Sequence, residues 1–76
     1  MSGWKIIKEM IRNRQFGEVK FNELKNYLET EGFRLEEGAK HVKVLTHSGT
    51  YVSSIPRQKT IRIDQLRYIL RQVGRL

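Results

Sequence analysis

Residues 33–55 read FRLEEGAKHVKVLTHSGTYVSSI, and the pattern in this stretch decides the fold class. Apolar and polar residues alternate along it, and Gly38 and Gly49 interrupt the alternation. Alternation with a period of two is typical of strands that bury one face, and glycine between two such runs is typical of a hairpin turn. The stretch therefore predicts three antiparallel strands, over residues 33–35, 42–46 and 50–55, with Pro56 ending the third.

Three segments outside this stretch repeat apolar residues at helical spacing. The second and third begin with an apolar residue followed by a capping residue, Phe21-Asn22 and Ile63-Asp64, and each ends at a glycine. The pattern predicts helices over residues 3–14, capped by Ser2, over residues 21–32 and over residues 63–74, with residues 15–20 as a turn. The predicted buried faces are Trp4, Ile7, Met10 and Ile11 in the first helix, Leu24, Tyr27 and Leu28 in the second, and Leu66, Ile69, Leu70 and Val73 in the third.

The order of the predicted elements is α-α-β-β-β-α, which predicts an α+β fold. We expect a two-layer sandwich, in which helices cover the apolar face of a three-stranded antiparallel sheet and leave the other face open. Side chains alternate along a strand. If Val42 and Val44 face the helices, then His41, Lys43 and Leu45 lie on the open face.

The length of 76 residues suits one compact domain. We expect residues 1–20 to form an N-terminal helical extension and turn, and residues 21–76 to form the main α-β-β-β-α unit. The chain has no cysteine, and His41 and His47 have no carboxylate cluster beside them, so we expect no metal and no other cofactor. The apolar runs are too short to span a membrane or to form a signal-peptide core, so we expect a soluble cytoplasmic protein.

The net charge of +7 comes from residues 39–76 alone. Residues 1–38 hold seven basic and seven acidic residues, whereas residues 39–76 hold eight basic residues and only one acidic residue, Asp64. Unpaired positive charges repel one another and destabilise a small domain. A domain that nevertheless retains them typically binds a polyanion. The charge therefore favours RNA or DNA as a partner. A solvated basic surface without a ligand and an acidic protein partner are the alternatives.

The candidate nucleic-acid contacts fall in two groups. Lys40, Lys43, Arg57 and Lys59 lie in or beside the predicted second and third strands. On the last helix, Arg67, Arg71 and Arg75 are spaced i, i+4 and i+8, which predicts one solvent-facing stripe that could track phosphates. The alternative for this stripe is a solvated face whose cations favour the helix C-terminus.

Four motifs after the first helix carry a resemblance to a known family. They are LKNYLE at 24–29 followed by EGF at 31–33, GAKH at 38–41, IP at 55–56, and LRYILRQVG at 66–74. With these motifs the chain, from Phe21 onward, resembles the HicA family of toxins, small proteins of bacterial and archaeal toxin–antitoxin pairs. The last motif is the most specific, because that family closes on a helix reading like Leu-Arg-x-Ile-Leu-Lys/Arg-Gln-Ala-Gly.

The resemblance implies a double-stranded-RNA-binding-like fold and an mRNA endoribonuclease that acts without metal. The family's single catalytic histidine follows a glycine-rich hairpin at the start of the second strand, and this position falls on His41. The resemblance also implies mRNA as the substrate and a HicB-like antitoxin as the protein partner. Residues 3–14 would extend the minimal toxin, with Trp4 as an anchor in the core or in a self-association surface.

The chemistry of histidine suits the implied role. RNA carries its own nucleophile, the 2′-hydroxyl group, so an imidazole that titrates near neutral pH can serve as the general base or acid. Lys40 and Lys43 flank His41 and would stabilise the transition-state charge, as would Arg57 or Lys59 if the loop after the third strand folds beside it.

Two other readings of these residues stay open. His47 sits beside Ser48-Gly49, and we expect it to be a turn residue rather than a second catalytic group. The second hypothesis for the whole chain is a non-catalytic nucleic-acid-binding module with the same fold. The third is an adaptor that binds an acidic or HicB-like protein.

Overall fold

Three helices and a three-stranded sheet make up the fold of this computed structural model, which describes residues 3–76. The helices are α1 (Gly3–Asn13), α2 (Phe21–Thr30) and α3 (Ile63–Gln72). The sheet consists of β2 (Arg34–Glu37), β3 (His41–Leu45) and β4 (Tyr51–Pro56), and two short strands, β1 (Val19–Lys20) and β5 (Thr60–Ile61), pair separately. The predicted α+β class and the order of the main elements are confirmed. The predicted cap at Ser2 lies outside the described residues.

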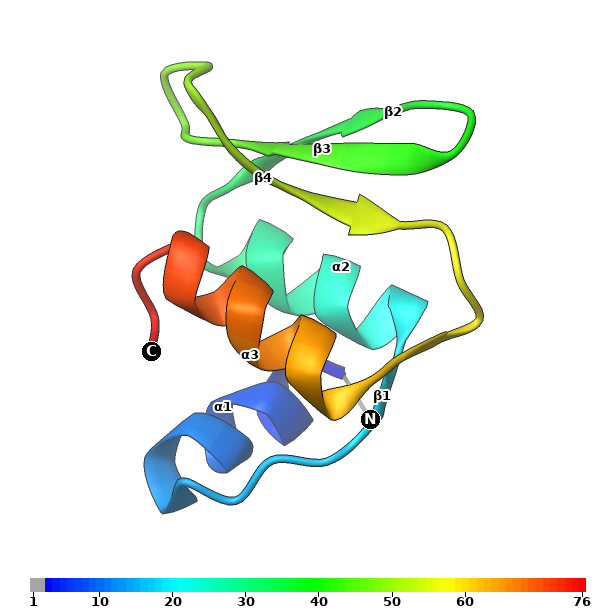
Figure 1. Ribbon diagram of the computed structural model, residues 1–76. Coiled ribbons are helices and arrows are strands. Elements are labelled where there is room, and N and C mark those ends of the chain that lie inside the picture. The colour runs from blue at the N-terminus through cyan, green and yellow to red at the C-terminus, as the bar shows by residue number, and fades with distance from the viewer. Residues whose placement is uncertain (1–2) are drawn as a thin grey trace.

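The helices lie on one side of the sheet. Figure 1 shows α2 and α3 next to each other beneath the sheet, with α1 beneath them on the far side from the strands. The predicted apolar faces of α2 and α3 are buried, and Ile7 of α1 is fully buried in the same core. Trp4 is half-buried and packs against this core. The N-terminal helix therefore shares the hydrophobic core of the rest of the chain.

The sheet order β2-β3-β4 is antiparallel throughout, and its register fixes which side chains face the helices. Val44 lies opposite Leu35 of β2, and Val42 lies opposite Ile55 of β4. Both valines are fully buried, whereas the alternate residues His41 and Lys43 are exposed. The predicted alternation is confirmed, and the open face carries the histidine and the lysine.

An irregularity in β4 changes its alternation. Val44 pairs with Ser53 and Leu45 pairs with Tyr51, so Val52 is an extra residue in a bulge. Ser53 is buried on the helix side, where its hydroxyl donates a hydrogen bond of 2.6 Å to Oε1 of Gln72. A polar residue thus occupies a position in the helix-facing layer and connects the sheet to α3.

The segment predicted as a plain turn at residues 15–20 contains a strand. Val19 pairs with Ile61 and Lys20 pairs with Thr60, and both apolar residues of this short ladder are buried. The turn prediction was wrong for residues 19 and 20, because the pairing joins segments about 40 residues apart and two residues give no alternation pattern.

The helix caps also differ from the prediction. The N-cap residues are Lys20 and Arg62, rather than Asn22 and Asp64. The backbone N–H of Lys20 donates to Oε1 of Glu23 at 2.7 Å, and that of Arg62 donates to Oε1 of Gln65 at 3.3 Å. Glu23 and Gln65, the third residue of each helix, therefore satisfy the N-cap backbone, and both helices begin at the predicted residues, Phe21 and Ile63, with a different capping residue.

Candidate functional site

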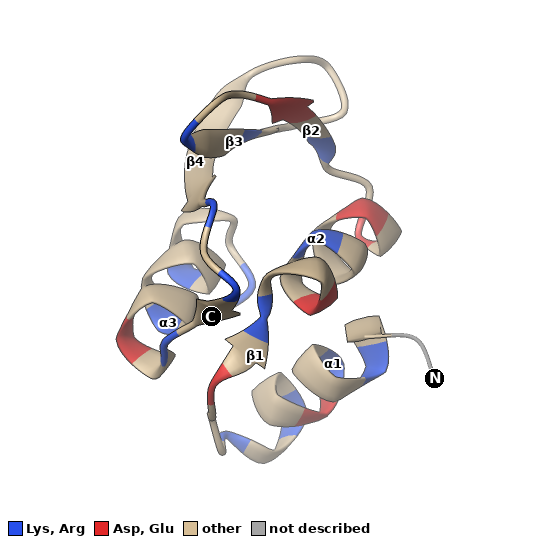
Figure 2. Cartoon of the chain, turned by 90° about the vertical axis from the view of Figure 1, so that its right-hand side faces the viewer, with Lys and Arg blue, Asp and Glu red and all other residues tan. Residues whose placement is uncertain are grey.

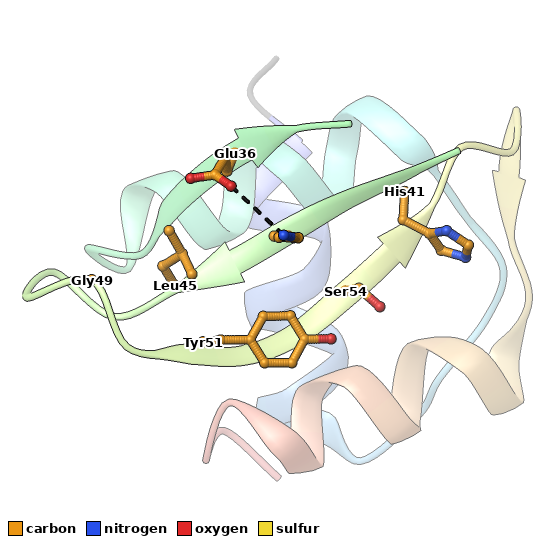
Figure 3. A pocket seen from close by; sticks show the side chains of 7 residues that line it. Glu36, His41, Leu45, Gly49, Tyr51 and Ser54 are labelled. Carbon is orange, nitrogen blue, oxygen red and sulfur yellow. Dashed lines mark ion pairs between the residues drawn. The ribbon is translucent and has the colours of Figure 1, made fainter. Parts of the chain in front are cut away.

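The open face of the sheet holds a shallow depression of about 570 Å³. Its lining comes from all three strands and from the β3–β4 turn: Glu36, His41, Lys43, Leu45, Gly49, Tyr51 and Ser54. Figure 3 shows these side chains standing on the sheet, with Tyr51, Ser54 and His41 following one another along the β4 side. These side chains stand on the open face because alternation along the strands sends Val42, Val44 and Ile55 to the buried face.

His41 is the first residue of β3 and lies opposite Pro56. The backbone before it is held in a tight turn, because a Cβ on Gly38 would lie 2.6 Å from the carbonyl oxygen of His41. The imidazole is exposed and makes no hydrogen bond or ion pair with any group in residues 3–76. Both ring nitrogens are therefore available to contact a ligand.

Lys43 stands two residues further along the same face. Its Nζ lies 3.9 Å from Oε1 of Glu36, which is directly opposite on β2, and both side chains are more than half exposed (59% and 63%). Exposed ion pairs of this length contribute little to stability, about 0–1 kcal/mol. The ammonium group can therefore leave Glu36 for a phosphate at small cost.

A second depression of about 380 Å³ adjoins the first, between the edge of β4 and α3. It shares His41 and Ser54 with the depression on the sheet. Its other lining residues are Pro56, Gln58, Gln65, Tyr68 and Ile69. His41 thus stands on the border of two hollows, and each of them contains a strongly exposed tyrosine, Tyr51 (57%) in one and Tyr68 (59%) in the other.

The loop after β4 folds beside the start of β3, as the prediction for Arg57 required. The backbone N–H of Arg57 donates to the carbonyl of Lys40 at 3.0 Å, and its Nε donates to the carbonyl of Gly38 at 2.6 Å. Its guanidinium group also pairs with Glu37. Arg57 therefore braces the hairpin that carries His41, and much of its hydrogen-bonding capacity is used within the protein.

Glu37 is the centre of a hydrogen-bond network with Lys25 and Arg57, which we call the Glu37 brace. Lys25 of α2 donates a hydrogen bond of 2.9 Å to its carboxylate, and Arg57 binds the other oxygen. The hydrogen bond from Lys25 is the main cause that lowers the pKa of Glu37 below its ordinary value of 4.5, and Arg57 adds to the effect. The network connects α2, the β2–β3 hairpin and the loop after β4.

The remaining predicted contacts are spread over the surface. Lys40 and Lys59 are exposed, in the β2–β3 turn and in the loop before β5. Arg67 and Arg71 line a different hollow, together with Arg14, Phe16, Ile63 and Leu76. This hollow shares no lining residue with either depression at His41. The structure therefore places Lys43 on the open face with His41, Lys40 and Arg57 beside the start of β3, and Arg67 and Arg71 as a separate pair on α3. Lys59 lies in the loop before β5 and lines neither depression.

The predicted stripe of three arginines on the last helix was wrong in its third member. The helix ends at Gln72, and Gly74 adopts a positive φ of 77°, which turns the chain away from the helix axis. Arg75 donates from Nε to Oε1 of Glu31 at 2.8 Å, beside the end of α2. Only Arg67 and Arg71 remain as an exposed pair on α3.

The two halves of the sequence, neutral and basic, interleave in space. Figure 2 shows basic residues on all three helices as well as on β3, with the acidic segment of β2 beside β3. Carboxylates of the first half pair with cations of the second half, as Glu36 does with Lys43, Glu37 with Arg57 and Glu31 with Arg75. The basic excess is therefore distributed, rather than gathered in one patch.

The sequence interpretation did not name several residues of the candidate site, among them Glu36, Tyr51, Ser54, Gln58, Gln65 and Tyr68. Alternation from the inward-facing Leu35 would have placed Glu36 on the open face. Tyr68, Gln58 and Gln65 gave no such signal, because the second depression, the groove between β4 and α3, forms only when α3 lies along the edge of β4. His47 lies exposed in the β3–β4 turn, as predicted.

Within residues 3–76, no three His, Cys, Asp or Glu side chains come together in a way that could hold a metal ion. None of the described helices is long and apolar enough to cross a membrane. Comparison with family models, curated proteins and solved structures found no significant match to this chain. The resemblance to HicA toxins therefore stays a prediction.

Proposed function

We propose that the protein binds single-stranded RNA across the open face of the sheet and cleaves it with His41, as a toxin similar to those of the HicA family. One observation carries the proposal: an exposed imidazole without an intramolecular partner stands where two hollows meet, and each hollow offers an exposed tyrosine. An RNA strand that crossed this border would bring a phosphodiester next to the imidazole.

The reaction that suits a single histidine is transesterification within the RNA. His41 takes the proton of a 2′-hydroxyl group as the 2′-oxygen attacks the adjacent phosphorus. The new bond joins the 2′-oxygen to phosphorus, and the bond from phosphorus to the 5′-oxygen breaks. The leaving 5′-oxygen receives a proton from the imidazolium or from water. The products are a 2′,3′-cyclic phosphate and a 5′-hydroxyl group.

Lys43 is the residue best suited to stabilise the charge of the transition state. It follows His41 on the same face of β3, and only a weak, exposed ion pair at 3.9 Å holds its ammonium group. Lys40, which directly precedes His41 in the turn, would add attraction for the neighbouring phosphate. Arg57 would act mainly through the hairpin, since its guanidinium group already binds Glu37 and Gly38.

Tyr51 and Tyr68 supply the binding platform. Stacking of a base on an aromatic side chain contributes about 1–3 kcal/mol and is possible with every base, which suits binding of single-stranded RNA. Because both rings are more than half exposed, stacking requires no rearrangement of the core.

The place of action and the partner follow from the proposed substrate. A protein that cleaves mRNA acts in the cytoplasm, and a toxin of this kind requires an inhibitor. A HicB-like antitoxin would silence it most directly by covering His41 and Lys43, so that RNA is excluded. Hydrogen exchange of the amides of residues 41–45 should then slow in the complex, and the antitoxin should compete with RNA.

The second candidate function is RNA binding without cleavage. One observation favours it: His41 is the only histidine in the two hollows, so the open face offers no second imidazole to act as the acid. A binding module would use the same tyrosines and lysines and would tolerate the loss of His41.

Inducible expression in bacteria separates the two functions. Wild-type protein is expected to stop growth and to fragment mRNA, whereas His41→Gln is expected to do neither while accumulating to the same level. His47→Gln is the matched control, because His47 is an exposed histidine in a turn away from the proposed phosphate position. Growth arrest with intact mRNA, or fragmentation by His41→Gln, would contradict the proposed nuclease.

A further inference from the structure

Tyr68 is strongly exposed, but its hydroxyl group is held in place. Nε2 of Gln72 donates a hydrogen bond of 3.0 Å to the Tyr68 hydroxyl oxygen. The Oε1 atom of the same Gln72 accepts the hydrogen bond of 2.6 Å from Ser53, which is only 2% exposed. A chain of two hydrogen bonds thus connects an exposed ring on α3 to the buried side of the sheet.

This arrangement preorganises the ring. A free tyrosine on a helix surface samples several rotamers, and a ligand that stacks on it must immobilise the side chain at a cost in conformational entropy. Anchoring through Gln72 and Ser53 removes part of that cost before a ligand arrives. Binding of a flat ligand is a function that would benefit from such anchoring.

The second depression, the groove between β4 and α3, also offers polar groups without a partner in the described part of the chain. Gln58 makes no side-chain hydrogen bond within residues 3–76, so both its carbonyl oxygen and its amide N–H groups are available. Gln65 uses its Oε1 atom at the start of α3, which leaves its N–H groups free. Carboxamides that present a donor beside an acceptor suit the edges of nucleobases.

We infer that this groove binds one nucleobase of the RNA, with Tyr68 stacking on the base and the amides of Gln58 and Gln65 contacting its edge. Pro56 and Ile69 provide apolar walls, and the volume of about 380 Å³ lies within the range of small-ligand sites. The inference rests on the proposed function, because His41 lines the same groove. The inference predicts that Tyr68, Gln58 and Gln65 determine which nucleobase is preferred next to the cleaved bond.

The test measures binding rather than cleavage. Short homo-oligomers of adenosine, cytidine and uridine with 2′-O-methyl sugars lack the nucleophile, so their affinities for the wild-type protein can be compared by fluorescence anisotropy. We expect the three affinities to differ. Tyr68→Ala should weaken binding of the preferred oligomer roughly 5- to 150-fold, as expected for one lost stacking contact. Tyr68→Phe should retain most of the affinity, and Gln58→Ala should make the three affinities more alike.

Tyr51→Ala is the control that separates the groove from the sheet. If Tyr51→Ala weakens binding and Tyr68→Ala does not, RNA binds the open face and the inference about the groove is wrong. Equal wild-type affinities for the three oligomers, or an unchanged preference in Gln58→Ala, would also overturn it. If the wild-type protein binds none of the oligomers, the proposed function fails and this inference fails with it.

Discussion

The carbonyl oxygen of His41 packs against the α-carbon of Gly38, so closely that a Cβ on residue 38 would lie 2.6 Å from that oxygen. The contact closes the β2–β3 hairpin, and Arg57 adds a hydrogen bond to the carbonyl of the same Gly38. The backbone that presents the histidine is therefore fixed by a glycine and an arginine on different elements. His41 owes its position to the hairpin, whereas its imidazole stays free.

Gly38→Ala is expected to distort this hairpin. The added methyl group would collide with backbone rather than with a flexible side chain, and overpacking of this kind costs about 1–3 kcal/mol. Thermal unfolding should show a clearly lower Tm. Gly17→Ala is the matched control, since its Cβ would meet only a methionine methyl group at 3.9 Å. A Tm for Gly38→Ala equal to that of the wild type would disprove the close packing.

The Glu37 brace makes stability depend on acid pH. Hydrogen bonding from Lys25, with help from Arg57, lowers the pKa of Glu37 in the folded protein below its ordinary value of 4.5. The carboxylate's stabilisation is therefore present above about pH 4.5 and is lost as the pH falls through the lowered pKa. In urea unfolding between pH 6 and pH 3, Glu37→Gln should show a smaller fall in stability than the wild type. Glu29→Gln, at an exposed position on α2, should follow the wild type.

Tyr27 makes stability depend on alkaline pH. Burial, together with the negative charge of Glu31, raises the pKa of Tyr27 from 10.0 to about 12, because both disfavour the phenolate. The pH dependence is opposite to that of Glu37. The stabilisation that Tyr27 contributes in its neutral form is complete below pH 10 and is lost as the pH rises toward 12. Tyr27→Phe should lose less stability than the wild type over this interval in denaturant titrations. The same alkaline loss in both proteins would show that Tyr27 is not responsible.

RNA binding should weaken steeply with salt, and the slope identifies the contacts. Each lost phosphate contact to single-stranded RNA reduces the slope of log K against log salt by about 0.7. Replacement of Lys40 and Lys43 by alanine should shallow the slope even with short oligomers. Replacement of Arg67 and Arg71 should do so only with RNA long enough to reach their separate hollow on α3.

Lys5 and Lys8 are the controls for this measurement. Both lie on α1 with their ammonium groups over the ring of Trp4, at 5.6 and 5.5 Å from its centre, on the far side of the helices from the sheet. Their replacement by alanine should leave the slope nearly unchanged. If it shallowed the slope as much as replacement of Lys40 and Lys43, RNA would bind elsewhere.

Local patterns in the sequence were sufficient to predict the layers and the open face. The alternation around Val42 and Val44 predicted that His41 and Lys43 point away from the helices, because one face of the sheet must be buried. The apolar residues of α2 and α3 likewise follow helical spacing, and their burial was predicted correctly.

Features that depend on contacts between distant segments were not predictable in this way. The pairing of Val19 with Ile61 has no local pattern, and the bulge at Val52 reverses the alternation that its neighbours suggest. The turn at Gly74 removes Arg75 from the arginine stripe. Tyr68 enters the candidate site only because α3 packs along the edge of β4.

Cleavage of a defined RNA oligonucleotide by purified His41→Gln, His47→Gln and wild-type protein, in excess EDTA, tests the central claim most directly. We predict that wild-type and His47→Gln protein yield fragments ending in 2′,3′-cyclic phosphate and 5′-hydroxyl groups, and that one 2′-deoxy nucleotide at the cleaved position blocks the reaction. His41→Gln should bind the RNA, unfold at the wild-type temperature and lose activity by about 10²- to 10⁴-fold. Cleavage by folded His41→Gln at the wild-type rate would contradict the account, as would wild-type protein that binds the RNA and leaves it intact.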